Sequence, residues 1–242
     1  MKLGEIYDRF IYLISVPKCV CCKSRLDFGS GPLCDGCLIK YHECTNRNCS
    51  RCSKVLSQCS CSMDYLKKHR VVKMIKLFRY LQREENLAAN SLIYSLKREN
   101  RKDVIDFCSN RLSLSVLNSI DKPSDYIITN VPRRKRSVVE FGYDHAEALA
   151  RGIASKLGCK YECFTISKNK TEQKALRGEA RKLNTSYQIK KQIDLHGKKV
   201  IIVDDVVTSG ASMGAVADLC KKLGAKEIVG ASLGITYKDQ LD

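Results

Sequence analysis

The sequence has 242 residues, enough for one domain of ordinary size and a small accessory module. Lysine and arginine outnumber aspartate and glutamate by 43 to 26, and the formal net charge of +17 favours polyanionic partners such as nucleic acid, phosphorylated metabolites or an anionic membrane surface. Tryptophan is absent and aromatic residues make up 7%, which argues against a long stacking platform for bases.

The N-terminal stretch Met1–Pro17 has the spacing of a short amphipathic helix. Glu5, Asp8 and Arg9 interrupt its apolar residues, so the uninterrupted apolar run is too short for a signal peptide or a membrane span. We expect this helix to pack on its own protein rather than on a membrane. A disulfide framework usually belongs to a secreted chain. Because no signal peptide is predicted, we expect the cysteines to lie in a reducing cytoplasm.

Ten of the 14 cysteines lie between Cys19 and Cys61. Two C-x2-C pairs, eleven residues apart, can place four thiolates around one tetrahedral zinc ion: Cys19, Cys22, Cys34 and Cys37. A second, less regular set has a C-x2-C pair and a C-x-C pair: Cys49, Cys52, Cys59 and Cys61. Cys44 is an alternative member of the second set. We therefore expect residues 1–62 to form a cysteine-rich zinc-ribbon module with one or two zinc ions that brace the fold, and contact of this module with nucleic acid stays open.

Residues 63–118 contain neither glycine nor proline and are rich in leucine, lysine, arginine, asparagine and serine. Apolar residues recur three and four apart at Ile75, Phe78 and Leu81 and again at Leu92, Ile93 and Leu96. This spacing predicts two or three basic amphipathic helices that pack on the core.

Residues 119–242 have the alternating pattern of an α/β domain. Apolar runs predict buried parallel strands at Tyr126–Thr129, Val200–Val203 and Ile228–Leu233. Helical patterns at about 144–157 and 211–223 separate them, so a parallel sheet flanked by helices is the expected architecture.

The segment Val200–Ser212 joins a hydrophobic strand to a helix through an acidic and hydroxyl-rich loop. The N–H groups at the start of a helix suit a phosphate, and Gly210 lets the backbone approach it closely. Asp204 and Asp205 lie at the carboxyl end of the strand, where open α/β sheets bind ligands. They can accept hydrogen bonds from a ribose diol, directly or through a magnesium ion.

This segment resembles the loop with which type I phosphoribosyltransferases bind phosphoribosyl pyrophosphate. The resemblance implies that Asp204 and Asp205 hold the ribose hydroxyls. It implies that the 5′-phosphate is cradled by Val206, Val207, Thr208, Ser209, Gly210, Ala211 and Ser212. Hypoxanthine–guanine-type members carry aspartate at the position of Thr208, and threonine cannot exchange a proton near neutral pH, so that type is disfavoured. Pyrimidine-type and non-catalytic interpretations stay open, and no catalytic residue is assigned.

Two further motifs run from Val131-Pro132 to Ala150 and from Gln173 to Tyr187. With the cysteine module, the helical segment and the loop, they resemble the layout of the ComF family of competence proteins, which serve natural transformation. Phe141 stands where the family usually has arginine, and Asp144-His145 replace its Asn-Gln pair. We expect His145 to begin a helix rather than to act as a base.

Two basic stretches accompany these motifs. Four consecutive cations can contact the pyrophosphate or a nucleic-acid backbone, or lie in solvent: Arg133, Arg134, Lys135 and Arg136. The segment Lys168–Lys191 has eight cations against two acids, among them Arg177 and Arg181. It is expected to be a loop over the site or a basic surface for single-stranded DNA.

The family resemblance implies an accessory protein of DNA uptake that binds single-stranded DNA and phosphoribosyl pyrophosphate beside a helicase-like ATPase, with structural zinc and with magnesium at the sugar phosphate. An active phosphoribosyltransferase, which transfers ribose 5-phosphate to an unidentified base, is the first alternative. A non-catalytic regulator that binds phosphoribosyl pyrophosphate or a nucleotide is the second.

Overall fold

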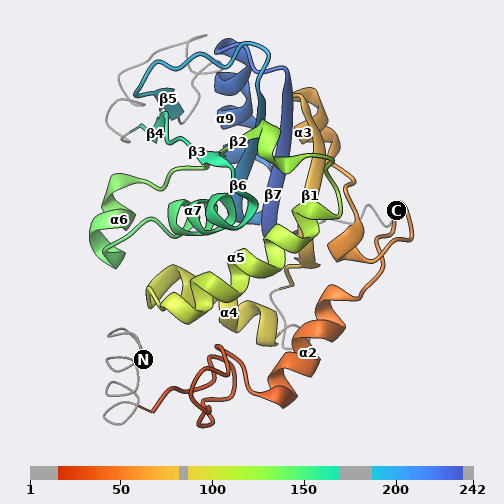
Figure 1. Ribbon diagram of the computed structural model, residues 1–242, viewed down its shortest axis with the longest axis vertical. Helices are drawn as coiled ribbons and strands as arrows, with labels where there is room; N and C mark the ends of the chain where they lie inside the picture. The colour runs from red at the N-terminus through yellow and green to blue at the C-terminus, as the bar shows by residue number, and fades with distance from the viewer. Residues whose placement is uncertain (1–15, 82–86, 169–186, 237–242) are drawn as a thin grey trace.

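A parallel five-stranded sheet forms the centre of the protein (Figure 1). The computed structural model describes residues 16–81, 87–168 and 187–236. The strands lie in the order β1 (Val71–Arg79), β7 (Glu227–Ile235), β6 (Lys199–Val207), β2 (Tyr126–Asn130) and β3 (Lys160–Tyr161), and every neighbouring pair is parallel. The carboxyl ends of β6, β7 and β2 therefore meet at one edge of the sheet, where α/β proteins bind ligands.

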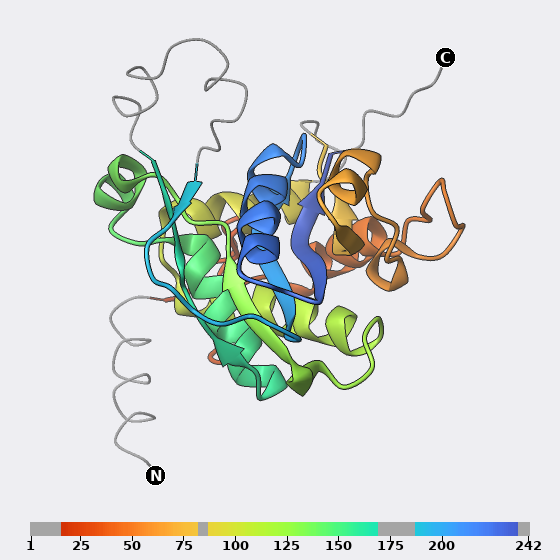
Figure 2. The ribbon, with the colours of Figure 1, turned by 90° about the horizontal axis from the view of Figure 1, so that it is seen from above.

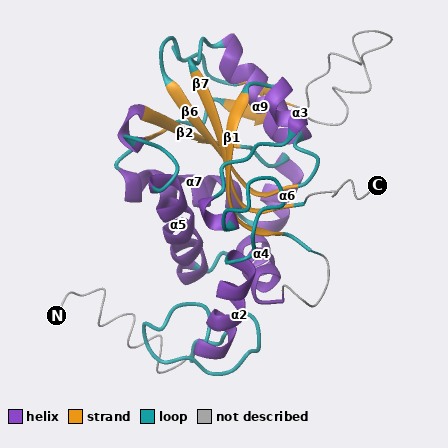
Figure 3. Cartoon of the chain, turned by 90° about the vertical axis from the view of Figure 1, so that its right-hand side faces the viewer, coloured by secondary structure: helices purple, strands orange, loops and turns teal. Residues whose placement is uncertain are grey.

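Helices cover both faces of this sheet, as Figure 3 shows. One hydrophobic core joins it to α2 (Asp35–Thr45), α4 (Leu87–Arg98), α5 (Lys102–Leu117) and α7 (His145–Leu157). The core on the other face joins it to α3 (Asp64–Lys68) and α9 (Ala211–Lys222). The predicted parallel sheet flanked by helices is confirmed.

The three strands predicted in the C-terminal part are β2, β6 and β7, and the two predicted helices are α7 and α9. Strand β6 is longer than its apolar run, because it continues through Asp204 and Asp205 to Val207 and pairs with β7 as far as Ile235. The acids thus lie on a strand that β7 still pairs, rather than on a loop.

The prediction of a helix around Ile75 and Phe78 is wrong, because Val71–Arg79 forms strand β1 at the edge of the sheet. Both faces of β1 are covered, so its apolar residues do not alternate with polar ones, and a short apolar run of this kind does not separate strand from helix. The helix expected around Leu92 and Leu96 is confirmed as α4, with both leucines buried. The domain boundaries at residues 62 and 118 stay predictions.

The cysteine-rich segment packs directly on the sheet. Tyr41 of α2 is buried and makes edge-on ring contacts with Phe78 of β1, at 6.2 Å, and with Phe107 of α5, at 5.4 Å. The backbone N–H of Met74 donates to the carbonyl of Ser60 at 3.0 Å, which covers part of the outer edge of β1. An edge strand covered in this way offers fewer free backbone groups to another chain.

A small antiparallel pair, β4 (Thr165–Ser167) and β5 (Tyr187–Ile189), stands beside the sheet. The predicted N-terminal helix lies outside the described residues, and so does most of the predicted loop Lys168–Lys191, including Arg177 and Arg181. Among the helices that the structure describes, none is long and apolar enough to cross a membrane.

Close packing of α5 on α7 leads to a test of the fold. A β-carbon added to Gly152 of α7 would lie 2.8 Å from the Cβ of Ser109 on α5, too close for real atoms. We expect Gly152→Ala to lower the free energy of unfolding by about 1–3 kcal/mol, measured by denaturant unfolding. Gly36→Ala in α2 is the control, because its added β-carbon meets nothing within 4 Å. Equal losses in both variants would contradict the described α5–α7 contact.

Candidate functional site

The acidic pair lies at the carboxyl end of β6, as predicted. The side-chain Oδ1 of Asp204 accepts a hydrogen bond of 2.9 Å from the backbone N–H of Asp205. Asp205 is buried, and its Oδ2 lies 2.9 Å from Nζ of Lys97 on α4 and 3.1 Å from Nε2 of His145 on α7. Both contacts are within ion-pair distance, although neither has the direction of a hydrogen bond. Two helices that cover one face of the sheet thus converge on one carboxylate.

The surroundings of the two carboxyl groups shift their pKa values in opposite directions. Burial raises the pKa of Asp204 well above its ordinary value, and the neighbouring charge of Asp205 raises it further. Burial also opposes the ionisation of Asp205, but His145 and Lys97 outweigh it, so the pKa of Asp205 lies below its ordinary value. A divalent cation or a sugar hydroxyl at Asp204 would favour the ionised form of that second carboxyl group.

The acidic pair opens into a pocket of about 250 Å³. Its wall is formed by Lys97, Val131, Pro132, Arg133, Arg134, Ser137, His145, Tyr187, Asp204, Asp205 and Ser212. Two buried nitrogens of this wall, Nη1 of Arg133 and Nδ1 of His145, have no hydrogen-bond partner among the described residues. Buried polar groups are normally paired, so such nitrogens are suited to a polar ligand.

Asp144 fixes the basic wall of the pocket. Its Oδ1 caps α7 by accepting hydrogen bonds from the N–H groups of Ala146 and Glu147, at 3.0 and 3.1 Å. Its Oδ2 accepts a hydrogen bond of 2.8 Å from the N–H of Arg133. One side chain therefore ties the segment after β2 to the start of α7. His145 begins α7, as expected, and in addition reaches Asp205.

The predicted phosphate loop leads into α9. Gly210 precedes the helix with φ of +80°, and the helix has no side-chain cap there. A side chain at Gly210 would also approach Cγ of Leu66 to 3.0 Å, so both conformation and space favour glycine. A small cavity of about 40 Å³ lies between the end of β6 and the first turn of α9. It is lined by Asp204, Val206, Val207, Thr208, Ser209, Gly210, Ala211, Ser212 and Met213. The start of this helix can therefore receive an anion.

Helix α3, from just after the cysteines, lies beside α9 (Figure 2). Leu66 and Tyr65 of α3 face Gly210 at the loop, and Nδ1 of His69 lies 2.9 Å from Oδ2 of Asp218 on α9. Helix α3, which follows the cysteine-rich segment in the chain, thus packs against the phosphate loop.

The structure brings together only some of the predicted cations. Arg133 and Arg134 line the pocket with the acidic pair. Lys135 and Arg136 are exposed in the first turn of α6 (Lys135–Phe141) and do not line it. No sequence pattern indicates Lys97, which lies on a helix far from the loop in the chain, or the contact between His145 and Asp205.

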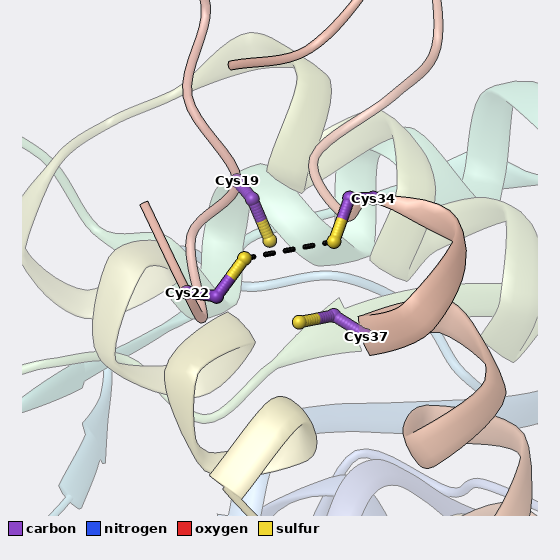
Figure 4. A group of neighbouring side chains, drawn as sticks. All are labelled: Cys19, Cys22, Cys34 and Cys37. Atoms are coloured by element: carbon purple, nitrogen blue, oxygen red, sulfur yellow. Dashed lines mark hydrogen bonds between the residues drawn. The ribbon is translucent and has the colours of Figure 1, made fainter. Parts of the chain in front are cut away.

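The first cysteine cluster has the arrangement predicted for one metal ion (Figure 4). The sulfur atoms of Cys19, Cys22, Cys34 and Cys37 all lie within 4.8 Å of one another, and those of Cys22 and Cys34 are 3.6 Å apart. One pair of thiolates from a turn and one from the start of α2 can surround a tetrahedral ion, and four sulfur ligands are the donor set of a closed zinc site.

The second cluster gathers in the same way, from Cys49, Cys52, Cys59 and Cys61. Neither Cys44 nor Cys21 belongs to either cluster. Lys76 of β1 is completely buried and points its ammonium group at the second cluster. Its Nζ donates to Sγ of Cys59 at 3.0 Å and to the carbonyls of Cys61 and Met74, at 2.8 and 3.2 Å.

Comparison with known proteins agrees with this arrangement. Residues 144–233 match the phosphoribosyl transferase domain. DNA utilization protein YhgH of Escherichia coli K12 is 26% identical over 144 residues, or 57% of this chain and 63% of that protein, so the chain matches less than two thirds of its length. YhgH of Salmonella typhi is 28% identical over 142 residues, with the same shares of both chains. Ribose-phosphate pyrophosphokinase of Thermococcus kodakarensis is 34% identical over 90 residues, or 36% of this chain and 27% of that protein.

The fold and the match define the class: a type I phosphoribosyltransferase-like domain, preceded by a cysteine cluster that fits a zinc ribbon. The resemblance to the ComF family, predicted from the motifs, is confirmed by the domain match together with the DNA utilization relatives.

Lys76 provides a test of the second metal centre. An ion bound by four thiolates leaves a net negative charge, which the buried ammonium group offsets. We expect the protein to carry two zinc ions, and Lys76→Met to weaken binding of one of them by roughly 10–100-fold, as a change in an outer-shell partner typically does. Zinc retained per chain during titration with a chelator measures this.

Lys73→Met is the matched control, since Lys73 lies on the same strand and donates to the carbonyl of Ser119 instead. A wild-type protein that holds one zinc ion, or a Lys76→Met variant that retains both as firmly as the control does, would contradict the assignment.

Proposed function

We propose that this protein is a ComF-like accessory protein of DNA uptake that binds phosphoribosyl pyrophosphate and single-stranded DNA. One observation carries the first part: Asp204 and Asp205, the uncapped start of α9, and Arg133 and Arg134 border two hollows at one edge of the sheet, and Asp204 and Ser212 line both. The acids suit a ribose diol, the helix start suits the 5′-phosphate, and the arginines suit the pyrophosphate. Magnesium would act between Asp204 and the bound sugar phosphate.

DNA binding is supported by charge and by the relatives. The net charge of +17 favours a polyanion, and the proteins named for DNA utilization match 57% of the chain. Arg134, Lys135 and Arg136 are exposed at the start of α6, where the helix dipole disfavours cations. A bound phosphate backbone would relieve that repulsion. Zinc in the two cysteine clusters completes the proposal, with a helicase-like ATPase as the partner in uptake.

The sugar-phosphate site is tested by calorimetric titration with phosphoribosyl pyrophosphate and magnesium. We expect Asp204→Asn to weaken binding roughly tenfold or more, because hydrogen bonds to a charged group are lost. Asp194→Asn is the control, since Asp194 is an exposed carboxylate paired with His196. Absence of binding in the folded wild-type protein would overturn this part of the proposal. Pyrophosphate release with a panel of nucleobases would identify a transferase instead of a binding protein.

DNA binding is tested by fluorescence anisotropy with a labelled oligothymidylate. We expect binding that weakens steeply between 50 and 200 mM salt, as counterion release requires for contacts with several phosphates. Changing Arg134 and Arg136 together to glutamine should reduce the slope of log affinity against log salt by roughly one to two units. A wild-type protein that does not bind the strand at low salt would rule out this function.

A further inference from the structure

Aromatic rings and guanidinium groups alternate on the surface beside the acidic pocket. The Cζ atom of Arg98 lies 4.8 Å from the ring centre of Tyr94 and 5.7 Å from that of Phe141. The Cζ atom of Arg133 also lies near Phe141, at 5.2 Å from its ring centre. Tyr94, Arg98, Phe141 and Arg133 thus form a series, called here the Tyr94–Arg133 stack, which joins α4 to α6 and ends in the pocket wall.

Internal packing does not account for this arrangement. Helix α4 buries Leu92, Ile93 and Leu96 in the core, whereas Tyr94 faces away from them and its residue surface is 56% exposed. Arg98 is exposed as well. The Tyr94 ring presents an apolar face at the surface, and Arg98 places a positive charge beside it. A nucleobase can stack on such a ring while its phosphate contacts the cation.

Tyr94 and Arg98 of the stack line a groove beside the sugar-phosphate pocket. This groove has a volume of about 390 Å³ and is lined in part by Tyr80, Tyr94 and Arg98. Lys97 lines both the groove and the pocket that holds Asp205. A nucleic-acid strand bound in the groove could therefore contact Lys97, at the border of the pocket.

We propose that this groove is a binding path for single-stranded DNA, in which a base stacks on Tyr94 while Arg98 contacts the backbone. The inference rests on the proposed DNA binding and gives it a location. A single strand is the form of DNA that fits, because its bases are free to stack, whereas a duplex turns them inward. Stacking on a ring and contact with a cation are open to every base and phosphate, so this mode of binding tolerates many sequences.

Stacking on Tyr94 is tested with the full chain and a labelled twelve-residue oligothymidylate. Tyr94→Leu should weaken binding roughly tenfold, since loss of one base–aromatic stack has an effect of this order. Tyr94→Phe should bind as the wild type does, because it keeps the ring. A strand of the same length without bases keeps the phosphates, so the wild type and Tyr94→Leu should bind it equally.

Arg98→Gln should weaken binding of the oligothymidylate several-fold more than Arg151→Gln. Arg151 is the matched control, since its Cζ lies 4.3 Å from the ring centre of Tyr161, in an arginine–tyrosine pair that does not line the groove. Titration with phosphoribosyl pyrophosphate should be unchanged in Tyr94→Leu, which shows that the protein is folded.

The outcomes separate this inference from the proposed function. If the wild type binds the oligothymidylate and Tyr94→Leu binds it equally well, the strand lies elsewhere, and the groove proposal is overturned while DNA binding stands. An equal loss with the base-free strand would also overturn stacking. If the wild type itself does not bind, both proposals fail together.

Discussion

The burial of Asp205 is the constraint around which the site is arranged. A carboxylate at the end of a central strand is costly to bury unless cationic or polar groups reach it, and Lys97 and His145 do so from two helices. The position of α4 is thereby fixed relative to β6, and so is the wall that carries Arg133, because Asp144 joins that wall to the start of α7. The pocket is shaped by charges that stabilise one another before any ligand arrives.

The second cysteine cluster supports the same site from the opposite face. The ammonium group of Lys76 has three donors, and all three are used between the cluster and β1. The chain then passes from the cluster directly into α3, whose Leu66 packs against Gly210 of the phosphate loop. A metal ion there would hold β1, α3 and the loop as one unit, so the cysteine-rich segment is better described as part of the site's support than as an appended module.

Local patterns in the sequence predict the strand before Asp204, the loop after it and the cysteine clusters. They do not predict the contacts between residues distant in the chain. The apolar run before Asp204, the loop to Ser212 and the cysteine spacings each lie within a short stretch, so their geometry follows from local chemistry. The residues of β1 predict a helix rather than a strand, because residues buried on both faces lose the alternation that identifies a strand. Lys76 and Lys97 look like solvated cations in a basic segment, and only the tertiary fold shows that each meets a partner distant in the chain.

These connections show why the matched domain alone does not define the protein. Residues 144–233 contain the acidic pair and the phosphate loop, but the groups that surround them come from earlier in the chain: Lys97 beside Asp205, Arg133 in the pocket wall, and Leu66 behind the loop. The exposed Tyr94 and the other residues that line the groove also come before the matched residues in the chain. A binding loop common to many phosphoribosyl proteins is thus placed among charges and rings particular to this chain, and in the proposed function these residues would decide which larger polyanion can approach a bound sugar phosphate.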